Sequence, residues 1–195
     1  MNPFLNITGV VLAGGQSSRF GSNKALALLH GKPLIQHVTD TVASIFNDCL
    51  LVTNTPRQYD FLNIPMIRDR YQDMGPLAGI HSALRHTGKS WIFVVSCDMP
   101  LVTSDLIAFL CSCIHGDYEA VIPWLETGAE PLCGLYNKTG LAKIEQYLKG
   151  GKAQVQGILE NLAVRKVKKE ELLQVTDDLQ VFYNVNRAQD LDRLF

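Results

Sequence analysis

The sequence predicts an α/β fold in which a mostly parallel β-sheet carries helices on both faces. Short apolar runs alternate with amphipathic stretches along the 195 residues, and 47% of the residues are hydrophobic against 19% charged. Alternating strands and helices favour a parallel sheet, and this composition is sufficient for a sizeable core. The chain has no internal repeat, low-complexity tract or linker. We therefore expect one domain over residues 1–195.

The first expected strand is Ile7–Leu12, a run rich in β-branched residues that ends at Gly14-Gly15. A glycine pair at this point favours a loop. Pro33 is typical of a first helical turn, and apolar residues follow it at helical spacing. Two further apolar runs, at Cys49–Thr53 and Pro65–Ile67, predict the second and third strands.

Gly75-Pro76 begins a second helical pattern, and Trp91–Ser96 is the most strongly predicted strand. Ser104 is expected to cap the helix after it. The rest of the chain continues the alternation. We expect strands over Ala120–Pro123, Leu132–Tyr136, Ala163–Val167 and Val181–Val185, helices over Thr139–Leu148 and Val155–Leu162, and a short terminal helix ending near Phe195.

The loop after the first strand carries three glycines and two cations within residues 12–24. Gly14-Gly15 and Gly21 allow sharp turns and bring amide N–H groups close to phosphates. Arg19 would grip a triphosphate through its planar fork, and Lys24 as a point charge. A glycine pair alone is more typical of an ordinary turn, but the two cations favour a phosphate site. The spacing fits neither a Walker A loop nor a dinucleotide fingerprint, which argues against a typical ATPase or dehydrogenase.

A carboxylate follows the strongest strand, at Asp98. In parallel sheets, ligands bind beyond the carboxyl ends of the strands, near the point where the strand order reverses. Asp98 is therefore well placed to hold Mg²⁺ against a triphosphate. The alternative is a turn residue before Pro100. On this residue alone the two interpretations are equally weighted, but the glycine loop favours the metal.

Polar residues follow three more expected strands. Asn54 comes after the second strand and could bind a base edge or a ribose, and Asp69 comes after the third. Asn184 and Asn186 flank Val185 at the end of the last expected strand, where extended geometry would turn both toward one side. Each residue alone fits a cap or a turn. Their shared position at one sheet edge is the argument for a site.

Composition and charge argue against several other classes. The net charge is −1, whereas a nucleic-acid binder usually shows a basic excess. The five cysteines form no C-x-x-C pair, so we expect reduced, buried thiols rather than a zinc site. No apolar run approaches the roughly 20 residues that cross a bilayer, and no signal peptide is evident. We expect a cytoplasmic protein with no membrane or nucleic-acid partner.

The motifs together resemble those of molybdenum cofactor guanylyltransferases, the MobA family. The resemblance begins with Leu12-Ala13-Gly14-Gly15-x-Ser17-x-Arg19-Phe20-Gly21-x-Asn23-Lys24-Ala25-Leu26. It continues, in the order and approximate spacing of the family, with Gly31-Lys32-Pro33-Leu34, Gly75-Pro76-Leu77-Ala78-Gly79-Ile80, Cys97-Asp98-Met99-Pro100 and Asn184-Val185-Asn186. The opening motif alone is typical of a large nucleotidyltransferase superfamily, whereas the ordered set is more specific and covers almost the whole chain.

The resemblance implies a Rossmann-like three-layer α/β/α sandwich and transfer of GMP from GTP to molybdopterin with release of pyrophosphate. It implies catalytic roles for Arg19, Lys24 and Asp98, with Mg²⁺, or Mn²⁺ as the alternative ion, on Asp98. The nucleotide-binding residues it implies are Leu12, Ala13, Gly14, Gly15, Lys24, Asn54, Asp69 and Asp98. Asn184 and Asn186 would lie on the molybdopterin side, and molybdenum-insertion and accessory proteins are the candidate partners.

Two other functions remain open at this point. A cytidylyl- or sugar-phosphate nucleotidyltransferase would share the fold and most of the site. Related cytidylyltransferases usually have Leu-Ala-Ala-Gly where this chain has Leu12-Ala13-Gly14-Gly15, so Gly14 favours a larger purine. A binding module that holds cofactor without turnover is the alternative from another class. Lys24, Arg19 and Asp98 argue against it, because a non-catalytic protein does not need leaving-group and metal residues.

Overall fold

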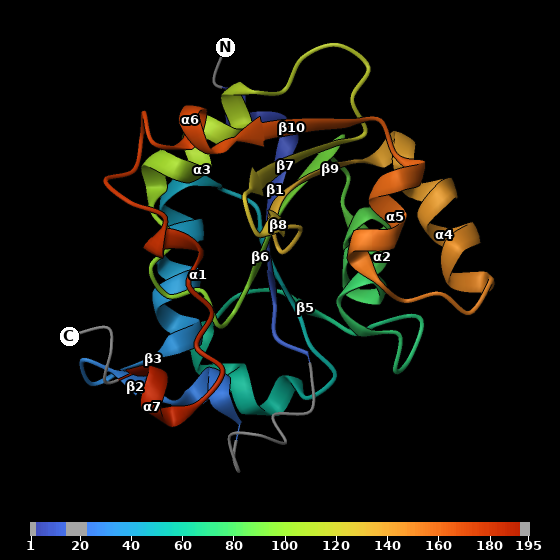
Figure 1. Cartoon of the computed structure of the whole chain (residues 1–195). Helices are drawn as coiled ribbons and strands as arrows, with labels where there is room; N and C mark the ends of the chain where they lie inside the picture. Colours follow the sequence, from blue (N-terminus) through green and yellow to red (C-terminus); the bar gives the residue numbers. More distant parts are fainter. Residues whose placement is uncertain (1–2, 15–22, 192–195) are drawn as a thin grey trace.

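The computed structural model describes residues 3–14 and 23–191 and centres on one twisted β-sheet (Figure 1). The strand order is β10-β7-β9-β6-β1-β4-β5, and β8 pairs with β7 beside this path. The strands are β1 (Ile7–Leu12), β4 (Cys49–Val52), β5 (Met66–Ile67), β6 (Trp91–Ser96), β7 (Ala120–Leu125), β8 (Gly128–Ala129), β9 (Cys133–Asn137) and β10 (Val164–Lys168).

Most neighbouring strands in this sheet run parallel. β1 is parallel to β4 and to β6, β4 is parallel to β5, and β10 is parallel to β7. Only β9, which pairs with both β6 and β7, and β8 are antiparallel among the strands described. Because the chain adds β4 on one side of β1 and β6 on the other, the strand order reverses at β1. The mostly parallel sheet is confirmed, and the reversal marks β1 as its switch point.

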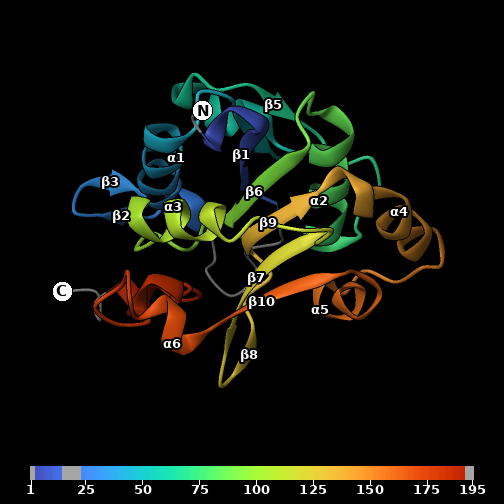
Figure 2. The ribbon, with the colours of Figure 1, turned by 90° about the horizontal axis from the view of Figure 1, so that it is seen from above.

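Helices cover both faces of the sheet, as Figures 1 and 2 show. On one side lie α1 (Leu34–Ile45), α3 (Ser104–Ser112) and α6 (Lys169–Leu172), and on the other α2 (Gly75–His86), α4 (Leu141–Lys149) and α5 (Val155–Ile158). Each side has its own cluster of buried apolar side chains. Val11 belongs to the α1 side and Val10 to the α2 side, so β1 is buried on both faces. The three-layer sandwich is therefore confirmed.

Close packing of α1 on β1 explains one glycine of the central strand. A Cβ atom on Gly9 would lie 2.5 Å from Cγ1 of Val42 and 2.7 Å from Cδ2 of Phe46. Both are buried residues of the α1 side, so neither has room to withdraw. Glycine in a strand interior commonly marks such a close approach. This contact fixes α1 against the strand whose carboxyl end carries the glycine-rich loop.

The predicted strand at Val181–Val185 is wrong. The chain there forms a 3₁₀ turn, η6 (Gln180–Phe182), followed by an irregular segment that leads to α7 (Ala188–Leu191). Both sides of β6 are already occupied, by β1 and β9, so the segment cannot join the centre of the sheet. Its apolar residues are buried instead: Val181 and Phe182 on the α1 side, and Val185 against Leu29 and Leu34.

Several short elements were not predicted. They are the 3₁₀ turns η1 (Pro3–Asn6), η2 (Lys24–Leu26) and η3 (Pro56–Leu62), and the hairpin strands β2 (Leu28–Leu29) and β3 (Lys32–Pro33). The turn η4 (Lys138–Gly140) overlaps the start of the predicted helix Thr139–Leu148, and η5 (Leu159–Asn161) lies within the predicted helix Val155–Leu162. Two-residue strands leave no periodic pattern, although positive φ at His30 and Gly31 is typical of a tight hairpin turn. The expected cap of α3 is also displaced by one residue, because Oγ1 of Thr103, not Ser104, accepts from the N–H of Leu106 at 3.3 Å. Within the described residues, the helices are all too short or too polar to cross a bilayer.

Candidate active site

Backbone hydrogen bonds bring four strand ends together at the carboxyl edge of the sheet. The N–H of Ala13 donates to the carbonyl of Val52 at 2.9 Å, and the N–H of Cys97 donates to the carbonyl of Leu12 at 3.0 Å. The N–H of Thr53 donates to the carbonyl of Ile67 at 2.9 Å. The loops after β1, β4, β5 and β6 therefore begin side by side, as the sequence predicts.

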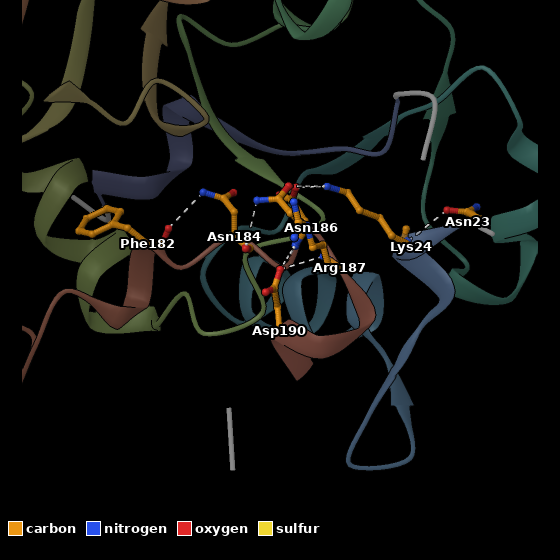
Figure 3. A network of polar contacts seen from close by, with 9 residues as sticks. Asn23, Lys24, Phe182, Asn184, Asn186, Arg187 and Asp190 are labelled. Carbon is orange, nitrogen blue, oxygen red and sulfur yellow. Dashed lines mark hydrogen bonds and ion pairs between the residues drawn. The ribbon is translucent and has the colours of Figure 1, made fainter. Parts of the chain in front are cut away.

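Lys24 and Asp98 meet at the centre of this edge. Nζ of Lys24 forms an ion pair with Oδ2 of Asp98 and lies 3.4 Å from Oδ1 of Asn186. Figure 3 shows the lysine extending from its own segment toward the C-terminal one. Oδ1 of Asp98 is buried and has no hydrogen-bond partner within the described part of the chain. Asp98 therefore has one oxygen that is paired and one that is available to a cation or donor from a ligand.

The segment around Val185 is attached directly to Asp98. The N–H of Val185 donates to the backbone carbonyl of Asp98 at 2.9 Å. Because this segment is not a strand, its two asparagines do not follow strand alternation. Asn186 contacts Lys24, whereas Nδ2 of Asn184 donates to the carbonyl of Phe182 at 3.2 Å (Figure 3). Of the two predicted asparagines, only Asn186 forms a side-chain hydrogen bond to the Lys24–Asp98 pair within the described residues.

Asp190 holds the Asn186 backbone in place. Its Oδ2 accepts from the N–H groups of Asn186 and Arg187, both at 2.8 Å. Nδ2 of Asn186 donates to the carbonyl of Asn184 at 3.3 Å, which leaves Oδ1 directed at Lys24 (Figure 3). The start of α7 thus positions an amide oxygen beside the central cation.

Asn54 and Asp69 form a second polar group at the edge, after β4 and β5. Nδ2 of Asn54 donates to Oδ2 of Asp69 at 3.0 Å, and the N–H of Asp69 donates back to Oδ1 of Asn54 at 3.1 Å. Oδ1 of Asp69 is buried without a hydrogen-bond partner in residues 3–14 and 23–191. Burial raises the pKa of Asp69 above its ordinary value, and the hydrogen bond from Asn54 only partly opposes this.

Two glycines lie next to the Asp69 carboxylate. A Cβ atom on Gly79, in the first turns of α2, would lie 3.0 Å from Cδ2 of Leu12 and 3.5 Å from Oδ1 of Asp69. A Cβ atom on Gly14 would lie 3.9 Å from Oδ2 of Asp69. At Gly79 the tight contact is therefore with Leu12, whereas the Asp69 oxygens would be in ordinary van der Waals contact with either Cβ atom.

The structure brings most of the predicted site residues together. Leu12, Ala13, Gly14, Asn54 and Asp69 lie at the ends of β1, β4 and β5, and Lys24, Asp98 and Asn186 lie beside the end of β6. Gly15 and Arg19 fall outside the described residues. Sequence reasoning missed Gln58 and Tyr59 of η3, both of which contact Asn23 next to Lys24. No motif signalled them, because nothing in the sequence shows which side of η3 faces the glycine loop.

The cysteines are not suited to take part in this chemistry, although Cys97 directly precedes Asp98. All five are free thiols, and all but Cys49 are buried. Burial raises the pKa of Cys97, which precedes Asp98, to about 12, so its thiol stays protonated at neutral pH. It is therefore not suited to act as a nucleophile.

Residues 9–167 match the model of the MobA-like NTP transferase domain. The chain belongs to the MobA-like NTP transferase family. This MobA-like protein is a nucleotidyltransferase, and both the predicted family and the predicted enzyme class are confirmed.

Relatives resemble this MobA-like protein along almost its whole length. The molybdenum cofactor guanylyltransferase of Desulfosudis oleivorans is 35% identical over 188 residues, covering 96% of this chain and 93% of the relative. A probable molybdenum cofactor guanylyltransferase of Carboxydothermus hydrogenoformans is 34% identical, covering 97% and 95%. The crystal structure of molybdopterin-guanine dinucleotide biosynthesis protein A from Archaeoglobus fulgidus superposes with a TM-score of 0.84 at 29% identity, covering 95% of both chains.

Proposed function

We propose that the protein transfers GMP from GTP to molybdopterin, forming molybdopterin guanine dinucleotide and releasing pyrophosphate. The observation that supports it most is a pair of carboxylates, the half-buried Asp69 and the buried Asp98, on opposite sides of the carboxyl end of β1. Each has an oxygen with no partner within the described residues. Unsatisfied buried polar atoms are unfavourable in a folded protein unless a ligand completes them. The names of the relatives supply the identity of the two substrates.

In this proposal the nucleoside occupies the β1, β4 and β5 ends. Oδ1 of Asp69 accepts a hydrogen bond from a ribose hydroxyl or a base N–H, while Asn54 holds the other oxygen. Gly14, which is exposed and has no side chain, lets a purine approach the backbone closely. Leu12 and Ala13, together with Gly15 outside the described residues, are the further residues proposed to bind the nucleotide.

Asp98 is the proposed Mg²⁺ ligand, with Mn²⁺ as an alternative ion. The fit rests on its buried, unpartnered Oδ1, since oxygen is the ligand that Mg²⁺ prefers. Among the described residues no group of three or more His, Cys, Asp or Glu side chains could hold a metal ion. A site with one protein carboxylate suits Mg²⁺, which commonly binds one or two carboxylates and completes its coordination shell with substrate phosphates and water. When bound, the ion would neutralise charge on the triphosphate.

The chemistry needs positioning more than proton transfer. A terminal phosphate of molybdopterin is already anionic at neutral pH, so it can attack the α-phosphorus of GTP without a general base. Lys24, together with Arg19 of the same loop, stabilises the departing pyrophosphate. Asn186, and Asn184 on the same segment, lie on the side where the acceptor phosphate approaches. We further propose that the reaction is cytoplasmic, with molybdenum-insertion and accessory proteins as partners.

The deciding experiment measures pyrophosphate release from GTP, CTP, ATP and UTP with Mg²⁺, with and without molybdopterin. Release from GTP alone, dependent on acceptor and metal, is expected. A preference for CTP would instead assign the protein to the cytidylyl branch with the same fold and site. GTP binding without release from any nucleotide would favour a non-catalytic binding module.

A further inference from the structure

The side chain of Asn23, which immediately precedes Lys24, uses both of its amide hydrogens and its oxygen. Oδ1 accepts from the N–H of Ala25 at 3.1 Å and caps the short turn η2, whose first residue is Lys24. Nδ2 donates to Oε1 of Gln58 at 2.5 Å and to Oη of Tyr59 at 2.8 Å. A cap alone would need only the oxygen. The two further hydrogen bonds join this residue to another part of the chain.

That other part is anchored in the core. Tyr59 is 2% exposed, and its side chain packs in the apolar cluster on the α1 side. It belongs to η3, which begins just after Asn54 at the end of β4. The buried ring thus presents its hydroxyl from a fixed position to Asn23. The hydrogen bond between Tyr59 and Asn23 therefore connects the segment after β4, where the nucleoside is proposed to bind, to the residue before Lys24.

The hydrogen bonds from Asn23 to Gln58 and Tyr59, called the tether below, restrict the backbone next to Lys24, whose side chain is flexible. The long Lys24 side chain has many accessible rotamers, and a 3₁₀ turn of three residues has few internal hydrogen bonds to fix its own direction. In this structure the side chain nevertheless extends to Oδ2 of Asp98 and toward Asn186. A fixed backbone at the root of Lys24 reduces the arrangements that the ammonium group can adopt.

We infer that Asn23, held by the core-anchored Tyr59 and by Gln58, is a positioning residue that aims the Lys24 ammonium group at the phosphate site beside Asp98. The inference rests on the proposed nucleotidyl transfer and adds residues outside the predicted site. Neither Asn23 nor Tyr59 touches the reacting atoms in this role. Both act through the direction of Lys24.

Four substitutions separate the tether from the cap. Asn23→Ser keeps an oxygen that can cap η2 but is too short to reach Tyr59. Tyr59→Phe keeps the buried ring and removes only the hydroxyl. Asn23→Asp still accepts from Ala25 and can accept from the Tyr59 hydroxyl, so it restores the tether without the bond to Gln58. Tyr147→Phe, on α4, is a matched control on the opposite layer.

The test measures GTP-dependent pyrophosphate release together with the thermal unfolding midpoint. We expect Asn23→Ser and Tyr59→Phe to lower kcat about 10-fold or more, with the KM for GTP changed less than about 3-fold and the unfolding midpoint little changed. Asn23→Asp and the Tyr147→Phe control should stay within about 3-fold of the unmodified protein. Unchanged kcat in both tether variants would overturn the inference, as would a loss that Asn23→Asp shares in full.

A binding measurement keeps the test independent of the reaction. Calorimetric titration with magnesium pyrophosphate should show affinity about 10-fold weaker for Asn23→Ser and Tyr59→Phe than for the unmodified protein and Tyr147→Phe. If the unmodified protein releases no pyrophosphate from GTP, the proposed function fails, and this titration still decides the tether. Equal affinities across the set would then contradict it.

Discussion

Buried and half-buried carboxylates at the two edges of the sheet differ in how their oxygens are hydrogen-bonded. Glu119 precedes β7, at the amino edge, and its Oε2 accepts from Nζ of Lys143 at 2.7 Å and from the N–H of Ala163 at 2.8 Å. Asp69 and Asp98 follow β5 and β6, at the carboxyl edge, and each has one buried oxygen without a partner in the described residues. All three residues lie next to strand ends of one sheet, so the shared fold alone does not explain why their oxygens are paired differently.

The pKa values follow the same division. Burial alone would raise the pKa of Glu119, but the hydrogen bonds from Lys143 and Ala163 outweigh it and lower that pKa. For Asp69, burial prevails over its single side-chain hydrogen bond and raises the pKa. One edge thus contains a carboxylate that stabilises the fold. The other contains Asp69, whose ionised form is incompletely compensated until a ligand binds, which is typical of functional sites.

The largest effect should come from Asp98→Asn. The substitution keeps the shape of the side chain and removes the negative charge proposed to hold Mg²⁺. We expect kcat/KM for GTP-dependent pyrophosphate release to fall about 1,000-fold or more, since charge stabilisation at the reacting phosphates is the main catalytic contribution. Steady-state kinetics over a range of Mg²⁺ concentrations measures this. Near-normal activity in a folded Asp98→Asn protein would contradict the metal assignment.

Asp69→Asn should change affinity and stability in opposite directions. The variant loses an anionic acceptor for the nucleoside, so the Kd for GTP is expected to rise about 10- to 100-fold. At neutral pH its free energy of unfolding should increase, because the folded protein no longer buries a carboxylate whose ionisation is disfavoured. Calorimetric GTP binding and urea unfolding test the two parts. Weaker binding with equally reduced stability would show a merely structural residue.

The central part of the fold could be predicted because its signals are local. β1 and β6 were predicted with their observed bounds, since long apolar runs rich in β-branched residues are distinctive. The grouping of Asn54, Asp69 and Asp98 followed from a topological rule, because parallel strands align their carboxyl ends whatever the loops do. The sequence alone could therefore predict the side of the sheet that holds the site.

The prediction failed where distant contacts decide the conformation. Val181–Val185 is as apolar as a strand, but the neighbouring positions in the sheet are taken and the segment instead docks on Asp98 through Val185. The contact between Asn23 and Tyr59 joins residues 36 positions apart. Neither can be read from a periodic pattern, because both depend on which surfaces the completed sheet leaves free.

Glu119→Gln should affect stability but not catalysis. The amide can still accept from Ala163, while the charge-assisted bond to the half-exposed Lys143 is weakened. We expect a loss of about 1 kcal/mol in the free energy of unfolding. The values of kcat and KM for GTP should remain within about 2-fold of the unmodified protein. Urea unfolding and steady-state kinetics on one preparation measure both, and a selective loss of kcat would remove the distinction between the two sheet edges.

The smallest expected effect is in how the free energy of unfolding of Asp69→Asn and Glu119→Gln depends on pH. The folded pKa of Asp69 is raised above its ordinary value of 3.8, so its favourable contribution is present below that pH and is lost as the pH rises through the folded value. The folded pKa of Glu119 is lowered below 4.5, so its contribution is present above that pH and is lost as the pH falls through the folded value.

Relative to the unmodified protein, Asp69→Asn should therefore be more stable and Glu119→Gln less stable at pH 7. Both differences should shrink in urea titrations as the pH falls, for Asp69 toward its ordinary pKa of 3.8 and for Glu119 below its ordinary pKa of 4.5, as each carboxyl group becomes protonated in the folded and unfolded states alike. Differences of the same sign at pH 7 would mean that the two edges do not differ as their hydrogen bonds indicate.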